Sequence, residues 1–441
     1  MAEAEATETA GAAGTMEISE QNGLEPGPAE STKARLSRAL RASPRVLSRP
    51  GAHNTVRGRL DQLLTQVSQV SEAAQVSRTG DIGGQDDQDA RDGQDPYGLD
   101  ERVDLYGDGV VRRLEERVAG LLGTEAAAFF PTGTMAQQVA LRCWAARTGN
   151  PTVALHPLAH PELHERGAFG TVSGLRTIHA TRRPRLPDPE EIHALEEPFG
   201  TLMLELPLRE AGFVLPTWEE LTATVEAARE REAVVHFDGA RLWESATHFG
   251  RPLSEIAALA DSVYVSFYKS LEGFGGAALA GPQSLIEEAA AWRHRYGGQI
   301  FQQFPTALSA LVGLDRELPR LPSYVAQARV VAEAVRAGFG RSDPGWWRVH
   351  PGVPHTHQFK VWLPWPPELL DEVSLAMAEE TGTALFSGWH TTVTDPPGIA
   401  ATEVTLGAPG LEWTGAQVES AAAEFVMRAR ERGKQGGGPA R

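Results

Sequence analysis

A lysine at the end of an apolar strand is the first residue that could do chemistry. Residues 262–267 alternate in the manner of a strand, and the chain then runs through Lys269 into a Gly-rich turn. A lysine that is partly shielded from water loses its proton more easily and can attack a carbonyl carbon to form a Schiff base. Taken alone, Lys269 could equally be a surface lysine that follows a strand. Other residues predicted near it must therefore distinguish a reactive lysine from an ordinary one.

An aspartate and an arginine follow the preceding predicted strand in the same way. Residues 233–237 lead into Asp238, and Arg241 comes three residues later. A buried carboxylate in this position can keep a pyridinium nitrogen protonated, as an electron-withdrawing cofactor requires, or it can cap the helix that follows. Because roughly 30 residues separate Asp238 from Lys269, the length of one strand–helix–strand unit, the two side chains can lie side by side.

A turn of small residues provides a possible anion site. Residues 129–136 read Phe-Phe-Pro-Thr-Gly-Thr-Met-Ala, a strand that runs into a helix. The backbone N–H groups of Gly133 and Thr134, the Thr134 hydroxyl and the helix dipole together suit a phosphate. The turn has neither the dinucleotide fingerprint nor the nucleotide P-loop pattern.

Two groups of histidines remain. His160 and His164 follow a predicted strand at residues 152–155, where an imidazole can stack on a flat ring or move a proton, although scattered surface histidines are the alternative. His355, His357 and His390 suggest a metal site, because His-x-His directs two imidazoles to one face. No acid or cysteine lies near them in the sequence, so we expect no metal and a position at the mouth of the substrate site.

The elements that must position these residues alternate along the chain from residue 109. Strands are predicted at residues 126–130, 152–155, 201–204, 233–237 and 262–267, with helices at 110–122, 133–146 and 218–229. This alternation predicts an α/β fold with a mainly parallel sheet that carries helices on both faces. The ligand then lies at the carboxyl ends of the strands.

Five segments are expected along the chain. They are a disordered or extended leader at 1–53, an amphipathic helix and acidic linker at 54–108, a cofactor-binding large domain at 109–317, a small C-terminal α/β domain at 318–434 and a flexible tail at 435–441. The small domain has predicted helices at 324–337 and 415–430 and strands at 358–363 and 402–406.

Composition narrows the class of protein. The 441 residues carry a net charge of −17 and one cysteine, Cys143, so we expect a cytoplasmic protein without disulfides that binds neither nucleic acid nor membrane. Residues 31–60 are an exception, since they contain eight basic residues and no acid. Prolines at 44 and 50 interrupt any long basic helix there, which favours an N-terminal extension or oligomer arm over a nucleic-acid or lipid contact.

The order of these groups resembles the threonine aldolase and β-eliminating lyase family of fold-type I pyridoxal-phosphate enzymes. The resemblance covers residues 106–311, and its most specific run is His-Phe-Asp-Gly-Ala-Arg-Leu-Trp at 236–243. It implies a seven-stranded-type large-domain sheet with a smaller C-terminal domain, and pyridoxal 5'-phosphate as the cofactor. By resemblance, Lys269 forms the Schiff base, Asp238 pairs with the ring nitrogen and His160 stacks on the ring.

The resemblance also implies which residues bind the anionic groups of the cofactor and the substrate. Gly133 and Thr134 would bind the phosphate, and Arg241 would contact the phenolic oxygen or the substrate carboxylate. Two family arginines are missing, because Phe301 replaces one at the phosphate and residues 402–405 lack the one that grips the carboxylate. A charge-assisted contact is worth about 1.5–3 kcal/mol, so these losses matter unless Arg293 or Arg295 substitutes.

The resemblance implies a lyase that acts on a small amino acid. We expect retro-aldol cleavage of a β-hydroxy amino acid to glycine and an aldehyde, with His160 or His164 accepting the β-hydroxyl proton. β-Elimination or another reaction at Cα is an alternative, and a degenerate fold-type I protein that serves as a binding or scaffold module is a second. By resemblance, the protein is a homodimer or homotetramer.

Overall fold

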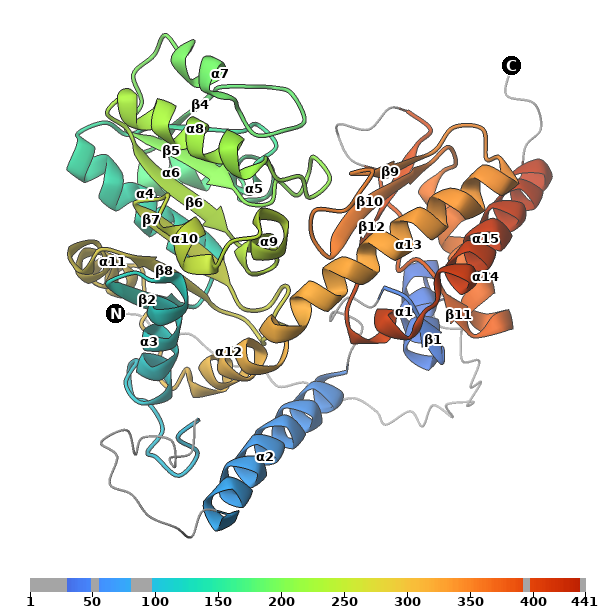
Figure 1. Cartoon of the computed structure of the whole chain (residues 1–441), viewed down its shortest axis with the longest axis horizontal. Coiled ribbons are helices and arrows are strands. Elements are labelled where there is room, and N and C mark those ends of the chain that lie inside the picture. The colour runs from blue at the N-terminus through green and yellow to red at the C-terminus, as the bar shows by residue number, and fades with distance from the viewer. Residues whose placement is uncertain (1–29, 49–54, 81–96, 392–396, 437–441) are drawn as a thin grey trace, which may run out of the picture.

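The computed structural model describes residues 30–48, 55–80, 97–391 and 397–436 (Figure 1). Most of the expected leader, most of the acidic linker and most of the C-terminal tail lie outside these described residues. Among the described helices, none is both long enough and apolar enough to cross a membrane.

A seven-stranded sheet with the order β2-β8-β7-β6-β5-β3-β4 lies at the centre of the large unit. Neighbouring strands from β4 through β3, β5 and β6 to β7 are parallel, and β8 is antiparallel to both β7 and β2. β3, β5, β7 and β8 are buried along their whole length, as expected for strands covered on both faces. The predicted mainly parallel sheet is therefore confirmed. The strands are β2 (Ala126–Phe130), β3 (Thr152–Leu155), β4 (Arg176–His179), β5 (Thr201–Glu205), β6 (Val234–Gly239), β7 (Ser262–Ser266) and β8 (Ala277–Gly281).

Helices cover both faces of this sheet, and local signals set their ends. Thr132 caps α4, since its hydroxyl accepts from the Met135 N–H at 3.2 Å, and a capping box at Thr217 and Glu220 starts α8. The helices of this unit are α3 (Val110–Leu122), α4 (Gly133–Thr148), α5 (His160–His164), α6 (Ala168–Ser173), α7 (Pro189–His193), α8 (Trp218–Glu230), α9 (Leu242–Phe249), α10 (Leu253–Ala257), α11 (Gln283–Arg295) and α12 (Phe304–Arg316). α4 and α11 pack on one face, and α3, α8 and α9 belong to the core on the other.

A second α/β unit follows α12. Its antiparallel sheet has the order β12-β10-β9, and α13 packs against α15 beside it (Figure 1). This unit faces the carboxyl edge of the large sheet with β10 and β12, which contribute Lys360 and Glu403. Its elements are α13 (Leu321–Ser342), β9 (Arg348–His350), β10 (Gln358–Leu363), α14 (Pro367–Thr381), β11 (Thr383–Ala384), β12 (Ala400–Thr405) and α15 (Gly415–Gly436).

The N-terminal segment is more ordered than expected between residues 32 and 46. α1 (Thr32–Ala42) packs on α14 through Leu36 and Leu40, and β1 (Arg45–Val46) pairs in parallel with β11. This differs from the expectation of a disordered or extended leader. The apolar residues interleaved with the basic ones form a buried face, and several of the basic side chains contact other parts of the chain. Arg35 bonds Glu379 at 3.1 Å, for example, and the Arg45 guanidinium lies 4.4 Å from the centre of the Trp413 ring.

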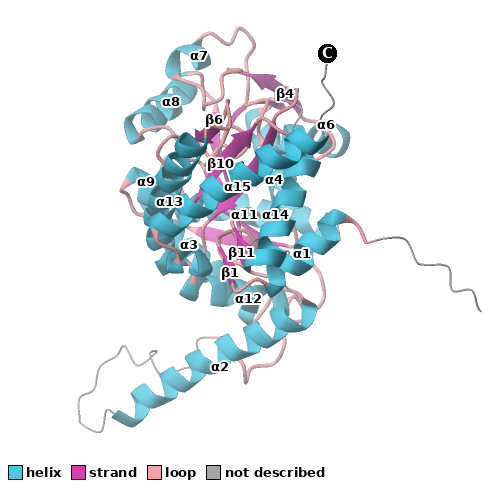
Figure 2. Cartoon of the chain, turned by 90° about the vertical axis from the view of Figure 1, so that its right-hand side faces the viewer, coloured by secondary structure: helices cyan, strands magenta, loops and turns pink. Residues whose placement is uncertain are grey.

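The amphipathic helix predicted after residue 54 is α2 (Val56–Gly80), which reaches away from the body in both views (Figures 1 and 2). Leu63 and Val67 pack on the main core beside α12, whereas Val56, Leu60 and Leu64 are exposed. Arg59 anchors the start of α2 by donating to the Glu272 carbonyl in the turn after Lys269.

Candidate active site

The carboxyl ends of β5, β6 and β7, with the residues that follow them, bring titratable side chains to one edge of the sheet. Glu205 ends β5 opposite Asp238 of β6, and Asp238 is in turn opposite Tyr264 of β7. Lys269 follows β7 by three residues, and Arg241 lies just after β6 as the N-cap of α9. Parallel strands present their carboxyl ends at the same edge, so residues distant in sequence meet there.

Lys269 lies partly buried at this edge and also lines the cavity described below. Burial and the nearby Arg241 guanidinium lower the pKa of Lys269 to about 8, while the Asp238 and Glu205 carboxylates act in the opposite direction. A lysine with such a pKa is partly neutral at physiological pH, as a carbonyl nucleophile must be.

Two carboxyl groups lie beside Lys269. Burial raises the pKa of Asp238, and the nearby Lys269 partly offsets that rise; the Asp238 carboxylate accepts from the Ala240 N–H at 3.1 Å. Burial and the Asp238 charge raise the pKa of Glu205 to about 7, although it accepts from the His160 N–H at 2.7 Å and the Arg209 N–H at 3.2 Å. Sequence reasoning missed Glu205, although an acid directly after the apolar run 201–204 was a usable signal.

The expected phosphate site is the N-terminus of α4. A Cβ at Gly133 would overlap the Tyr264 hydroxyl, so only glycine fits there. Thr134 is exposed one residue later, where the first N–H groups of a helix lack intrahelical acceptors. The two arginines considered as substitutes have other partners: Arg293 donates to Glu115 and to the Phe129 carbonyl, and the Arg295 guanidinium lies 4.5 Å from the centre of the Trp292 ring.

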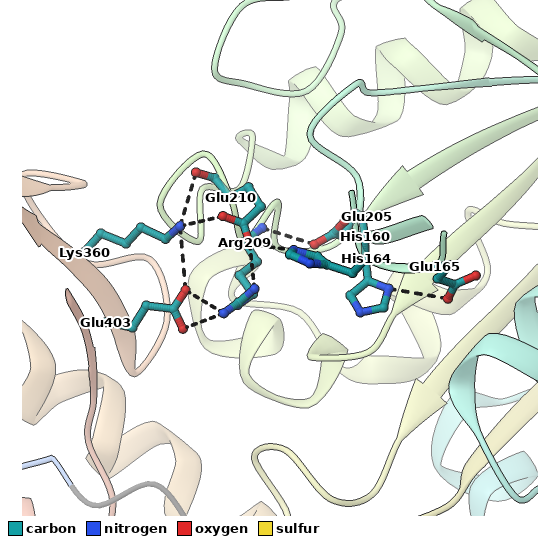
Figure 3. Close-up of polar contacts among 8 residues, drawn as sticks. All are labelled: His160, His164, Glu165, Glu205, Arg209, Glu210, Lys360 and Glu403. Atoms are coloured by element: carbon teal, nitrogen blue, oxygen red, sulfur yellow. Dashed lines mark hydrogen bonds and ion pairs between the residues drawn. The ribbon is translucent and has the colours of Figure 1, made fainter. Parts of the chain in front are cut away.

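His160 begins α5 at the same edge (Figure 3). Its Nδ1 lies 3.4 Å from Glu165, and its backbone N–H donates to Glu205, which is opposite Asp238 in the sheet. The ring centre of His164 is 5.2 Å from that of His160, and its Nε2 lies 3.1 Å from Glu210.

A cluster of charged residues joins the large unit to the second unit (Figure 3). Lys360 Nζ lies 2.9 Å from Glu210 and 3.6 Å from Glu403, and Arg209 lies 2.9 Å from Glu403. Although burial opposes the shift, Lys360 and Arg209 lower the pKa of Glu210 to about 2. Glu403 belongs to the segment where the family's carboxylate-binding arginine was expected, so an acid stands there and is held by two cations.

A cavity of about 1030 Å³ opens beside Lys269 between the two units. Lys269, Arg241 and Ser270 line it from the large unit, His357 and His390 from the second unit. The expectation that the second histidine group lies at the substrate mouth remains a prediction, and these two histidines have a position that is compatible with it.

The third histidine of that group lies elsewhere. His355 accepts from the Leu215 N–H at 2.9 Å, and its ring centre lies 4.4 Å from that of His248. Within the described ranges, no three His, Cys, Asp or Glu side chains gather in a group that could hold a metal.

Curated proteins similar to this chain are low-specificity L-threonine aldolases. A protein of that name from Arabidopsis thaliana is 30% identical over 52% of this chain, and the match covers 66% of its own length. The Escherichia coli protein is 32% identical over 53% of this chain, and the match covers 71% of its length.

Solved structures of similar proteins can be superposed on a longer part of this chain than the sequence matches cover. A Listeria monocytogenes protein assigned as an L-allo-threonine aldolase has a TM-score of 0.72 at 31% identity and covers 91% of this chain and 99% of its own. Serine palmitoyltransferase from Sphingomonas wittichii, at 15% identity and a TM-score of 0.52, shares the fold alone. Residues 86–339, more than half of the chain, match the family model of the beta-eliminating lyases. The chain belongs to this family of pyridoxal-phosphate-dependent lyases.

Proposed function

We propose that this enzyme cleaves the Cα–Cβ bond of a small β-hydroxy amino acid and releases glycine and an aldehyde. The observation that carries the proposal is the position of Lys269, half-buried beside the buried Asp238 and open to the cavity that Arg241 also lines. The names of the similar proteins, low-specificity L-threonine aldolases, support a threonine-like substrate.

The residues at the sheet edge fit pyridoxal 5'-phosphate. Lys269 would hold it covalently, Asp238 would pair with its ring nitrogen, and the α4 N-terminus at Gly133 and Thr134 would take its phosphate. His160 would stack on the ring. When bound, the cofactor withdraws electrons from the substrate Cα.

Arg241 is our candidate for the substrate carboxylate. It lines the cavity, and among the described residues its Nε has no hydrogen-bond partner. Arg209 and Lys360 are already paired with Glu210 and Glu403, so Arg241 is the better placed of these cations to replace the missing family arginine.

Product analysis tests the function. The purified protein with added pyridoxal phosphate is incubated with L-threonine and with L-allo-threonine, and NMR follows the products. We expect glycine and acetaldehyde in equal amounts. Formation of 2-oxobutanoate and ammonium would instead establish β-elimination, and failure to bind the cofactor would leave only a binding or scaffold role.

The Gly133→Ala variant tests the phosphate site. The added Cβ forces either α4 or the buried Tyr264 to move, which should cost roughly 1–3 kcal/mol and weaken cofactor affinity about 10- to 100-fold. The measurement is an absorbance titration with pyridoxal phosphate. Gly120→Ala in α3 is the control, since its Cβ meets nothing within 4 Å and its cofactor affinity should be unchanged. Equal affinities in the two variants would contradict the assignment.

The rate of cofactor attachment should depend on the protonation of Lys269. Only the neutral amine attacks, so the rate should rise with pH through a midpoint near the Lys269 pKa of about 8 rather than the ordinary 10.5. Arg241→Gln should move this midpoint upward, because Arg241 lowers the Lys269 pKa. Stopped-flow absorbance across pH 6–11 measures the effect, and a midpoint near the ordinary value in the unmodified protein would contradict it.

We also infer that the protein is a cytoplasmic homodimer or homotetramer. Support comes from apolar side chains that are exposed in the single chain, namely Val56, Leu60 and Leu64 on α2 and the edge-to-face pair of Tyr106 and Phe301. Light scattering coupled to size-exclusion chromatography measures the assembly, and a monomer at micromolar concentration would exclude both states.

A further inference from the structure

We propose that His357, oriented by Glu244, is the base that takes the proton of the substrate's β-hydroxyl group. This inference rests on the proposed function, because it names a catalytic residue for that same cleavage. It replaces the expectation that His160 or His164 accepts this proton.

His357 and Glu244 come from different units and meet beside the cavity. His357 immediately precedes β10, and Glu244 lies in the first turn of α9, three residues after Arg241. His357 Nε2 lies 3.7 Å from a Glu244 carboxylate oxygen. The imidazole lines the cavity shared with Lys269 and Arg241, whereas the fully buried Glu244 stands outside the lining.

The imidazole of His357 is enclosed by its neighbours, but they form no hydrogen bonds to its nitrogen atoms. His357 is only 3% exposed, and the ring of Tyr324 stacks at a centre distance of 6.1 Å. Among the described residues, neither ring nitrogen of His357 has a hydrogen-bond partner. A buried, unpartnered imidazole is costly, which favours a polar ligand or water at one of its nitrogen atoms.

The charge states suit a base. Burial and Arg241 lower the pKa of His357 to about 3, so the free imidazole is neutral, and the imidazolium that forms needs the stabilisation that a neighbouring carboxylate gives. Burial raises the pKa of Glu244 to about 7, while Arg241, Ser270 and Lys269 act against that rise and favour the carboxylate. The carboxylate can fix the Nε2–H tautomer, leave Nδ1 as the acceptor and stabilise the imidazolium that forms.

The other two histidines at the site are less suited to this step. His160 is 38% exposed with Nδ1 directed at Glu165, and in the proposed function its ring stacks on the cofactor. His164 is 43% exposed, and its Nε2 is engaged by Glu210. Solvent exposure lets water compete for the imidazole, whereas His357 is enclosed.

The proposed step breaks one O–H bond and one C–C bond and forms one C=O double bond. The O–H bond of the β-hydroxyl breaks and its proton moves to His357 Nδ1 as the Cα–Cβ bond breaks and the aldehyde C=O forms. The electron pair of the Cα–Cβ bond stays on the glycine fragment. That fragment takes up a proton at Cα, and His357 returns its own proton to solvent, so no oxidant or other reactant is needed.

The experiment compares two reactions of the holoenzyme. Cleavage of L-threonine needs the β-hydroxyl base, whereas exchange of the glycine α-proton in D₂O needs the cofactor and Lys269 but no β-hydroxyl. We expect His357→Gln to reduce kcat for cleavage about 10²- to 10⁴-fold with KM changed only a few-fold. Glycine exchange and cofactor affinity, measured by absorbance titration, should stay as in the unmodified protein.

Glu244→Gln is the test of the positioning residue and the second variant if His357→Gln fails to fold. It should lower kcat in the same direction while KM, glycine exchange and cofactor affinity are kept, a split that a merely structural role would not produce. Glu244→Asp should recover part of the lost kcat. His355→Gln is the matched control, because His355 lies outside the cavity and bonds the Leu215 N–H.

The possible results separate failure of this inference from failure of the proposed function. Cleavage at the unmodified rate in both His357→Gln and Glu244→Gln overturns the inference and leaves the proposed function intact. Loss of cleavage in His164→Gln but not in His357→Gln assigns the proton to His164 instead. If the unmodified enzyme exchanges the glycine α-proton but cleaves no β-hydroxy amino acid, the proposed function and this inference both fail.

Discussion

Replacing Lys269 with alanine should abolish covalent attachment of pyridoxal phosphate and reduce cleavage about 10³-fold or more, because the chain loses its only lysine at the cofactor edge. The chain has four lysines in all, at positions 33, 269, 360 and 434. Lys360 is held by Glu210 and Glu403, and Lys33 and Lys434 are exposed. Borohydride reduction followed by peptide mapping identifies the labelled lysine.

Lys33→Ala is the matched control for this experiment. Lys33 lines the same cavity but lies on α1, away from the strand ends, so its loss should leave the labelled peptide and the visible absorbance unchanged. An adduct of equal yield in Lys269→Ala would disprove the assignment of Lys269.

Replacing Asp238 with asparagine should lower kcat on the order of 10²- to 10³-fold, the usual cost of removing one preorganised electrostatic partner. The amide keeps the shape and can still accept from the Ala240 N–H, but it no longer holds the ring nitrogen protonated. Steady-state kinetics with L-threonine measure the loss, and circular dichroism checks the fold.

Asp104→Asn is the control for loss of a buried carboxylate. Asp104 is as buried as Asp238 and accepts from the Gln303 and Phe304 N–H groups, but it belongs to the loop before α3. Its replacement should affect stability more than turnover. Unchanged turnover in Asp238→Asn would argue against a pairing with the cofactor ring.

Much of the fold was predictable because hydrophobic periodicity is a local property. The strand predicted at residues 201–204 and the helix at 218–229 were found within about a residue of their observed ends. β8 was missed because its residues, Ala-Ala-Leu-Ala-Gly, lack the β-branched and aromatic side chains typical of strands. It forms a strand because β2 and β7 pair with it on both sides.

The N-terminal segment likewise depends on contacts with distant parts of the chain. The basic residues of 31–60 indicate an extension or arm, but their spacing does not show what they contact. α1 is ordered because α14 offers an apolar surface and Glu379 an ion-pair partner, both more than 300 residues further along the chain.

The chemistry of the edge could be inferred from the chain alone: a lysine, an aspartate, a glycine turn and a histidine, each at the end of an apolar strand or within a few residues of it. Parallel strands necessarily bring such residues together, so their order along the chain was enough to indicate the cofactor. The tertiary structure decided the surroundings, because burial and neighbouring charge depend on contacts between distant segments. Three features of the site arise only from tertiary packing. Glu205 is buried, and Glu403 pairs with Lys360 and Arg209. His357 of the second unit lies beside Glu244 of the large unit.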